Sequence, residues 1–259
     1  MINVRLTGVL CLIASSLFGS DEVWNVLRPG LETVNSSFRD QDTVVTFTAA
    51  RCDPKIYRIR VVSTFREIGK ANSYAAFSIR EVARVTRALL VVNAGSTDSY
   101  SLPAPVGLLI TDGITISGIA RSAKNGGVFC VAGDRLTIAS VARMESQKCT
   151  DAVQRGPLLS SGSSAGEANE RHRRTVAALD DKGRLVILVT HEETTLSALA
   201  TFLYTSELVM KIQSALNLDG DASSGLLMIG DRDNTKRIAI GNVDGLVASV
   251  IAITERKLP

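Results

Sequence analysis

Hydrophobic residues along the chain fall mainly in short runs separated by turn residues. Residues 43–48 and 56–63 are rich in β-branched side chains and flank Asp53–Pro54, a pattern typical of two strands joined by a tight turn. Residues 74–87 and 194–210 instead have apolar positions at helical spacing. The pattern predicts a single α+β domain with a mixed, largely antiparallel twisted sheet and a few packed helices. Further strand-like runs cover residues 88–92, 114–119, 127–131, 135–141, 184–189 and two parts of 237–253.

The first 20 residues have the pattern of a secretory signal peptide. Arg5 precedes an apolar stretch, residues 6–18, which ends among small residues. The stretch is short for a membrane span, which needs about 20 apolar residues. A buried N-terminal helix is the alternative interpretation. We expect an exported protein, secreted or periplasmic, whose mature domain covers residues 21–259. No later segment reaches membrane-spanning length, so no membrane partner is expected after signal removal.

Composition and charge are typical of a globular protein. Hydrophobic residues make up 45% of the 259 positions, enough for a sizeable core. The formal net charge is only +3, because 29 Lys and Arg are balanced by 26 Asp and Glu. This balance argues against a nucleic-acid partner, which usually requires a strongly basic face.

Export changes the interpretation of the four cysteines. Cys11 would leave with the signal peptide, and the remaining Cys52, Cys130 and Cys149 allow at most one internal disulfide. Cys130 and Cys149 are closest in the sequence, so we expect them to pair and Cys52 to stay a buried free thiol. The chain has two histidines and no Cys/His spacing typical of zinc, so a histidine metal site is not expected.

Residues 214–225 combine an apolar run with a turn of small and acidic residues. The apolar part predicts a strand that delivers Asp219 and Asp221 into a tight turn at Gly220. The hydroxyls of Ser223 and Ser224 are suited to cap the next element or to bind an anion. The same residue types also form ordinary strand-to-turn junctions. A divalent cation at Asp219 and Asp221 is a further interpretation, although the Glu that closes an EF-hand calcium loop is lacking.

Other segments place polar residues and glycines beside apolar runs. On residue type alone, Asn93 either closes a strand or orients a sugar hydroxyl, and Arg174 is either a solvated strand-edge residue or a phosphate ligand. Together with the turn at 217–224, these segments resemble, in the same order, the phosphodiester glycosidase family over residues 88–228. Three positions depart from the family's pattern: Ser96 replaces an aromatic residue, Arg155 a small residue and Asp221 a glycine. The segments are Asn93-Ala94-Gly95, Pro105-Val106-Gly107-Leu108, Gln154-Arg155-Gly156-Pro157 and Arg174-Thr175.

The resemblance implies hydrolysis of a sugar-1-phosphate diester without a cofactor, with a carbohydrate phosphodiester as the binding partner. Asp219 would stabilise positive charge at the anomeric carbon or activate water, Arg174 would hold the phosphate, and Asn93 would position the sugar. The three departures leave an alternative open, a glycan-binding relative that has lost catalysis. The implied substrate-binding residues are Gly95, Gln154, Gly156, Gly220, Asp221, Ser223 and Ser224.

Overall fold

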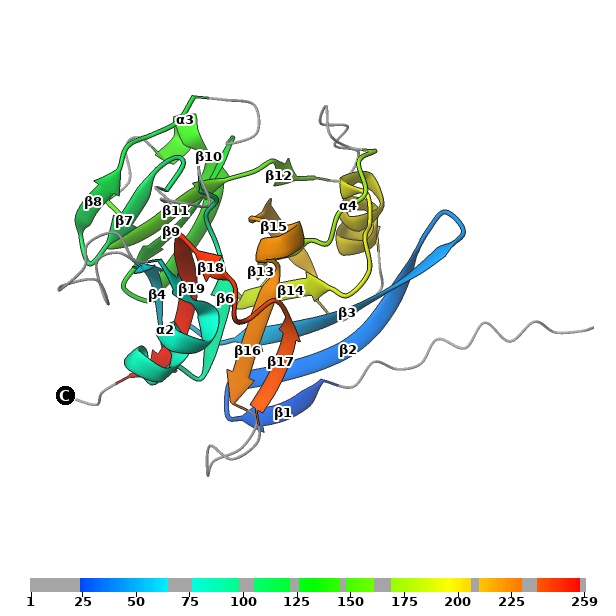
Figure 1. Ribbon diagram of the computed structural model, residues 1–259, viewed down its shortest axis with the longest axis horizontal. Helices are drawn as coiled ribbons and strands as arrows, with labels where there is room; N and C mark the ends of the chain where they lie inside the picture. Colours follow the sequence, from blue (N-terminus) through cyan, green and yellow to red (C-terminus); the bar gives the residue numbers. More distant parts are fainter. Residues whose placement is uncertain are drawn as a thin grey trace, which may run out of the picture.

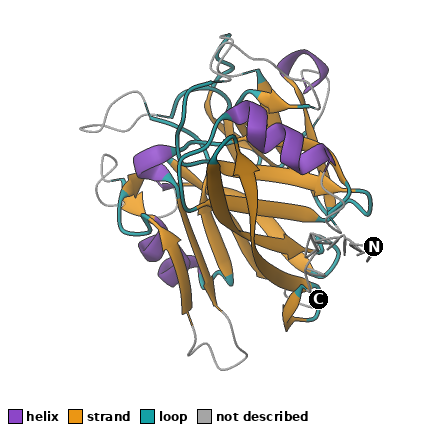
Figure 2. Ribbon diagram, turned by 90° about the vertical axis from the view of Figure 1, so that its right-hand side faces the viewer, coloured by secondary structure: helices purple, strands orange, loops and turns teal. Residues whose placement is uncertain are grey.

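The computed structural model describes residues 24–64, 76–97, 105–121, 126–144, 148–160, 169–205, 210–229 and 237–256, so the predicted signal peptide lies outside the described residues. Strands dominate this part of the chain (Figures 1 and 2). The expected α+β class with a few packed helices is confirmed only in part, because the fold is mainly β. The largely antiparallel pairing expected from the sequence is confirmed, but the described strands form three larger sheets and a two-stranded pair in place of one mixed sheet. Within the described residues, no helix combines the length and hydrophobicity needed to cross a membrane.

The largest sheet has seven strands in the order β1-β2-β3-β14-β13-β15-β12. β2 and β3 pair along their whole lengths around a tight turn, where Gln41 takes a positive φ of 56°. β13 and β14 are buried at every position, since one face meets the other sheets and the other face meets a helix. The strands are β1 Asn25–Arg28, β2 Leu31–Asp40, β3 Thr43–Cys52, β12 Leu158–Leu159, β13 Thr175–Asp180, β14 Leu185–Thr190 and β15 Ile212–Asn217.

Two five-stranded sheets have the orders β10-β9-β11-β7-β8 and β17-β16-β6-β19-β4. Their buried side chains join those of the seven-stranded sheet in one central cluster, with Leu90, Phe129 and Leu185 among its members. This shared core fixes the three sheets around one another. The strands are β4 Tyr57–Ser63, β6 Leu90–Asn93, β7 Leu109–Thr111, β8 Ile114–Ser117, β9 Gly127–Ala132, β10 Arg135–Ser140, β11 Asp151–Arg155, β16 Gly225–Ile229, β17 Arg237–Gly241 and β19 Ser249–Glu255, and the separate pair is β5 Phe77–Ser78 with β18 Leu246–Val247.

The helices lie outside the sheets (Figure 1). α2 (Ile79–Thr86) begins later than the expected residue 74, because Ser78 and Glu81 form a reciprocal capping box. It ends at Arg87, which takes the left-handed conformation with φ 53°. Residues 74 and 75 of the expected helix lie outside the described residues.

The second expected helix is α4 (Leu196–Thr205). The Oγ1 of Thr195 accepts a hydrogen bond from the Ala198 N–H at 3.1 Å, so one of the two expected capping residues caps it. Its apolar face covers the seven-stranded sheet, where the rings of Phe202 and Phe38 stack 4.6 Å apart. The two shorter helices are α3 Val141–Met144 and the 3-10 turn η2 Asp221–Ser223.

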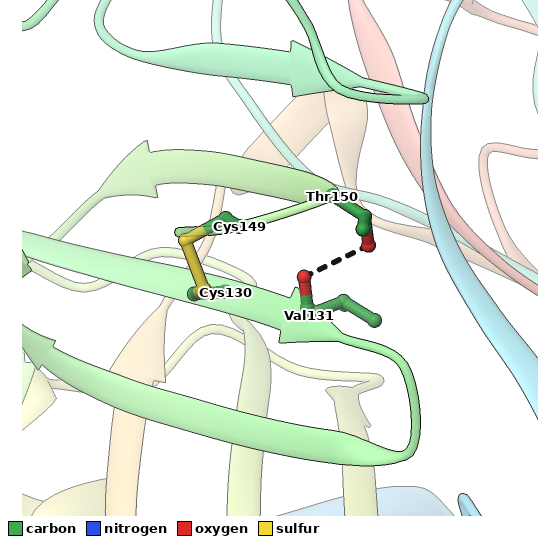
Figure 3. Close-up of a disulfide and its surroundings, with 4 residues drawn as sticks. All are labelled: Cys130, Val131, Cys149 and Thr150. Carbon is green, nitrogen blue, oxygen red and sulfur yellow. Dashed lines mark hydrogen bonds between the residues drawn. A yellow bond between two sulfur atoms is a disulfide. The ribbon is translucent and has the colours of Figure 1, made fainter. Parts of the chain in front are cut away.

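A disulfide joins β9 to the segment that leads into β11 (Figure 3). It connects Cys130 and Cys149, the pair favoured by sequence separation, with the two Cα atoms 5.6 Å apart. Beside it, the Thr150 hydroxyl donates to the Val131 carbonyl oxygen at 3.0 Å, as the dashed line in Figure 3 marks. Cys52 is a buried free cysteine, as expected, and burial raises the pKa of its thiol well above the ordinary value.

Candidate active site

The candidate site forms where β6, β11, β13 and β15 meet. Asp219 follows β15 by two residues, while Asn93 and Arg155 are the last residues of β6 and β11. The N–H of Asp219 donates to the carbonyl oxygen of Ala94 at 2.9 Å and so ties the turn after β15 to the end of β6. Strand register thereby brings together side chains that are far apart in the sequence.

Asn93 is the buried hub of this junction. Its Nδ2 donates to the backbone oxygen of Asp219 at 2.6 Å. Its Oδ1 accepts from the Thr175 hydroxyl at 2.9 Å and from the Gly225 N–H at 3.1 Å. The side chain is fully buried, so these contacts favour a role in positioning the Asp219 turn over the expected direct contact with a sugar.

The turn after Asp219 packs closely on the strand entry at Arg173. A Cβ added to Gly220 would lie 2.7 Å from the Arg173 carbonyl oxygen, so glycine is needed for this approach. Asp221 takes a positive φ of 52°, and its N–H donates to the same oxygen at 3.0 Å. Ser224 is fully buried, with its Oγ 3.2 Å from the Thr175 hydroxyl, so it supports the turn instead of facing a ligand.

The carboxylate of Asp219 is the functional centre of this geometry. Its Oδ1 accepts from Arg155 Nη2 at 3.0 Å, and one fifth of each side chain is exposed (19% and 20%). Burial raises the pKa of the Asp219 carboxyl above its ordinary value, although the charge of Arg155 and a hydrogen bond from the Ser223 side chain act in the opposite direction. A carboxyl group with this pairing can take up or release a proton near a bound substrate.

Asp221 faces a different partner. Its Oδ2 lies 2.6 Å from Nδ1 of His172, while Nε2 of the same ring lies 3.3 Å from a Glu170 carboxylate oxygen. The imidazole is about one third exposed (36%), so it is oriented by carboxylates and still open to solvent. Asp219 and Asp221 therefore point to separate cationic or ionisable partners.

The geometry gives no support for a cation shared by the two aspartates. No group of three or more His, Cys, Asp or Glu side chains suited to a metal ion occurs in the described residues. Cation ligation by Asp219 and Asp221 stays a prediction that the contacts do not favour.

The guanidinium of Arg174 donates to backbone oxygens of the neighbouring chain segments. Its Nη2 donates to the Glu170 carbonyl oxygen at 2.6 Å, and its Nε donates to the Thr194 carbonyl oxygen at 3.3 Å. The residue is only 5% exposed. The phosphate-binding role expected for Arg174 is therefore less well supported than a structural one, because its donors fix the segment before β13.

These residues lie within residues 86–254, which match the family model described as phosphodiester glycosidase. The chain belongs to the phosphodiester glycosidase family. No curated protein sequence matches it.

Solved structures show the same fold. The catalytic domain of zebrafish N-acetylglucosamine-1-phosphodiester alpha-N-acetylglucosaminidase, auto-inhibited by its pro-peptide, is 17% identical with a TM-score of 0.67, over 88% of this chain and 85% of that one. A hypothetical protein from Synechocystis is 14% identical with a TM-score of 0.59, over 88% of this chain and 62% of that one. At these identities the likeness concerns the fold.

Other segments of the family pattern hold the scaffold together. Gln154 is fully buried; its Oε1 accepts from the N–H groups of Leu108 and Ala120, and its Nε2 donates to the Ala120 carbonyl oxygen. Gly107 approaches this side chain with φ 89°, which explains a glycine before Leu108. The substrate contact expected for Gln154 is therefore not what its hydrogen bonds indicate.

Gly95 and Gly156, also expected to contact substrate, instead bind side chains of neighbouring strands through their backbone groups. The Gly95 N–H donates to the Ser249 hydroxyl at 3.0 Å, and a Cβ at Gly95 would lie 2.8 Å from that oxygen. The Gly156 carbonyl oxygen accepts from Asn217 Nδ2 at 3.1 Å. Both residues are buried and serve the junction of strands beneath the site.

Of the residues expected at the site, the structure groups Asp219, Asn93, Gly220, Asp221, Ser223 and Ser224 around one turn. Arg174, Gln154, Gly95 and Gly156 lie in the supporting elements. Sequence reasoning missed Arg155 and His172 as site residues. Arg155 was visible as a departure from the family's pattern, and His172 stands two residues before Arg174 in a basic cluster.

Proposed function

We propose that this protein hydrolyses a sugar-1-phosphate diester at Asp219 and releases the free sugar. The proposal rests mainly on one observation: a largely buried carboxylate is held at a four-strand junction, within the family's fold, beside a guanidinium. The side chain of Asn93 donates a hydrogen bond to the backbone oxygen of Asp219, so the carboxylate is positioned before any ligand binds.

The chemistry suits this pair. Cleavage breaks the bond between the anomeric carbon and the bridging oxygen; the phosphate monoester leaves with that oxygen, and water supplies the oxygen of the sugar. Asp219 would stabilise positive charge at the anomeric carbon or remove a proton from water. Arg155, beside it, would hold the departing phosphate, since a guanidinium offers paired donors to phosphate oxygens.

His172 is a second candidate for proton transfer. The contact of Nδ1 with Asp221 fixes the ring, which leaves Nε2 on the side of the exposed Glu170 carboxylate. The imidazole is therefore held in place and stays accessible to solvent or to a bound ligand.

The alternative is a glycan-binding relative without catalysis. The contact that favours it is the ion pair itself, because Arg155 replaces a small residue and engages the carboxylate that would act on the sugar. In that case phosphoglycans bind and none is hydrolysed.

We further propose that the protein is exported through its N-terminal signal and acts in the secreted or periplasmic space without a cofactor. The N-terminal pattern of residues 1–20 supports export. N-terminal sequencing of the exported protein is expected to begin between residues 17 and 21. A start at Met1 would contradict export through this signal.

The proposed activity is tested by incubating the protein with sugar-1-phosphate methyl diesters of several hexoses and measuring free sugar. The Asp219→Asn variant should bind substrate but lose turnover by ~10²-fold or more. The matched control is Asp181→Asn, which makes the same change at an exposed turn residue and should leave turnover unaltered. Binding by calorimetry without sugar release from any diester would favour the binding relative.

A further inference from the structure

A cavity of 1170 Å³ lies at the far end of strands that carry the site. β11 runs from Asp151, in the cavity lining, to Arg155 beside Asp219, and β6 begins after Leu89, also in the lining, and ends at Asn93. At ~3.3 Å per residue, the four steps along each strand separate the two places by about 13 Å. The residues that line this cavity include none from the Asp219 site.

Arginines dominate the polar lining of this cavity. Five arginines face three carboxylates among the residues that line it. The arginines come from elements far apart in sequence, so the concentration of charge is a product of the fold and not of a basic run. The arginines are Arg28, Arg58, Arg60, Arg87 and Arg256, and the carboxylates are Asp112, Asp151 and Glu255.

Ion pairs neutralise part of the positive charge of these arginines. Arg28 pairs with Glu255 at 3.1 Å, and Arg60 pairs with Asp112 at 2.6 Å. Arg58 reaches the same Asp112 carboxylate at 3.4 Å, and its side chain is 57% exposed. Asp112 is thus shared between two guanidiniums, and Asp151 also interacts electrostatically with Arg60, so the excess positive charge of the lining comes from the other arginines.

Two further arginines add charge that these carboxylates do not neutralise. Arg256 donates to the carbonyl oxygens of Tyr57 and Pro54, which are neutral acceptors. Arg87 is exposed at the C-terminal cap of α2, and its side chain contacts no carboxylate within the described residues. The backbone of this cap places Arg87 among the residues that line the cavity.

We propose that this arginine-lined cavity binds a ligand that carries two or more phosphate or sulfate groups. Guanidinium groups bind such oxyanions through paired, charge-assisted hydrogen bonds, and Arg58, Arg87 and Arg256 bring guanidiniums to the lining from three different segments of the chain. The volume is larger than one inorganic phosphate needs and exceeds the usual range of small-molecule pockets, about 300–1,000 Å³. An extended ligand with several anionic groups fits both the size and the charge. This proposal is independent of hydrolysis at Asp219.

The test is calorimetric titration of the purified protein with inorganic tripolyphosphate at low salt. Arg87→Asn removes the charge and keeps a residue that tolerates the left-handed cap, and it should weaken binding ~10-fold, as expected for one charge-assisted contact. The double variant Arg58→Gln/Arg87→Asn should weaken it ~100-fold, if the two contacts are independent. Orthophosphate should bind at least ~10-fold more weakly than tripolyphosphate, because it reaches fewer arginines.

The matched control is Arg84→Gln, which removes the same charge from an exposed position of α2 that does not line the cavity. It should change affinity less than about twofold. An equal loss in Arg84→Gln and Arg87→Asn would overturn the proposal, because it would indicate a general effect of charge. Absence of binding at millimolar tripolyphosphate together with absence of binding of sucrose octasulfate would also overturn it. Tighter binding of the sulfate probe would support the cavity and identify sulfate as the preferred oxyanion.

Discussion

Replacing Asn93 by Ala should destabilise the protein strongly, because this side chain links three segments. The change removes the donor to the Asp219 backbone oxygen at 2.6 Å and the acceptor of the Thr175 hydroxyl at 2.9 Å and the Gly225 N–H at 3.1 Å. The site is fully buried, so the groups left behind have no water to replace the lost contacts. Each unsatisfied buried group costs about 1–3 kcal/mol. Allowing for partial relaxation, we expect a loss of ~3–5 kcal/mol, a large part of the ~5–15 kcal/mol of a typical domain.

Equilibrium unfolding in urea measures this loss. The only tryptophan, Trp24, lies under the Arg51 guanidinium, whose carbon is 4.2 Å from the ring centroid, so its fluorescence reports unfolding. The matched control is Asn35→Ala, an exposed asparagine whose Oδ1 accepts from the Thr48 hydroxyl at 2.7 Å. That variant should lose at most about 1 kcal/mol. Equal unfolding free energies for Asn93→Ala and Asn35→Ala would refute the assignment of Asn93 as the hub of the site.

Three further predictions concern the ion pair, the buried arginine and the disulfide. Arg155→Gln removes the charge that lowers the pKa of Asp219, so that pKa should rise further. If Asp219 acts in its ionised form, the acidic limb of the pH profile of kcat/KM should then move to higher pH, and the control Arg155→Lys should move it less. An acidic limb that does not move in Arg155→Gln would exclude Asp219 as the titrating group. Arg174→Ala should lower the free energy of unfolding by about 1.5–3 kcal/mol in urea denaturation, because two backbone carbonyl oxygens lose their donor. If the variant is as stable as the parent but binds the diester more weakly, Arg174 binds phosphate after all. Cys149→Ser should lower the free energy of unfolding by ~3 kcal/mol in the chain-entropy model, since the disulfide closes a loop with a sequence separation of 19. Peptide mapping without reduction that finds Cys52 in a disulfide would contradict the pairing.

The local sequence pattern predicted individual strands better than the way these strands pair into sheets. The runs at 127–131 and 184–189 are strands β9 and β14 with ends shifted by one residue, because burial on alternating or both faces shows directly in the residue types. The division into three antiparallel sheets depends on pairings such as β6 with β16 and β19, which join residues more than 100 positions apart. No local signal specifies such pairings, so the single mixed sheet was wrong.

At the candidate site, too, the sequence predicted local structure but not contacts between distant segments. The turn at Asp219 was predictable, because Asp, Gly and Ser follow an apolar run and match a family segment. The partner of Asp219 was not, since Arg155 reaches it across 64 positions of sequence. Arg174 looked like a phosphate ligand by residue type, but its guanidinium is occupied by the carbonyl oxygens of Glu170 and Thr194. These contacts depend on how the segments that carry Glu170 and Thr194 pack against β13, which residue type does not indicate.

The most direct test of a glycosidase is the position of oxygen from water in the products. A sugar-1-phosphate diester hydrolysed in ¹⁸O-labelled water would be cleaved at the anomeric carbon if the proposed reaction is right. Mass spectrometry should then find the label in the released sugar and an unlabelled phosphate monoester, with no product from Asp219→Asn above about 1% of the parent rate. Label in the phosphate monoester would show cleavage at phosphorus and would contradict the account.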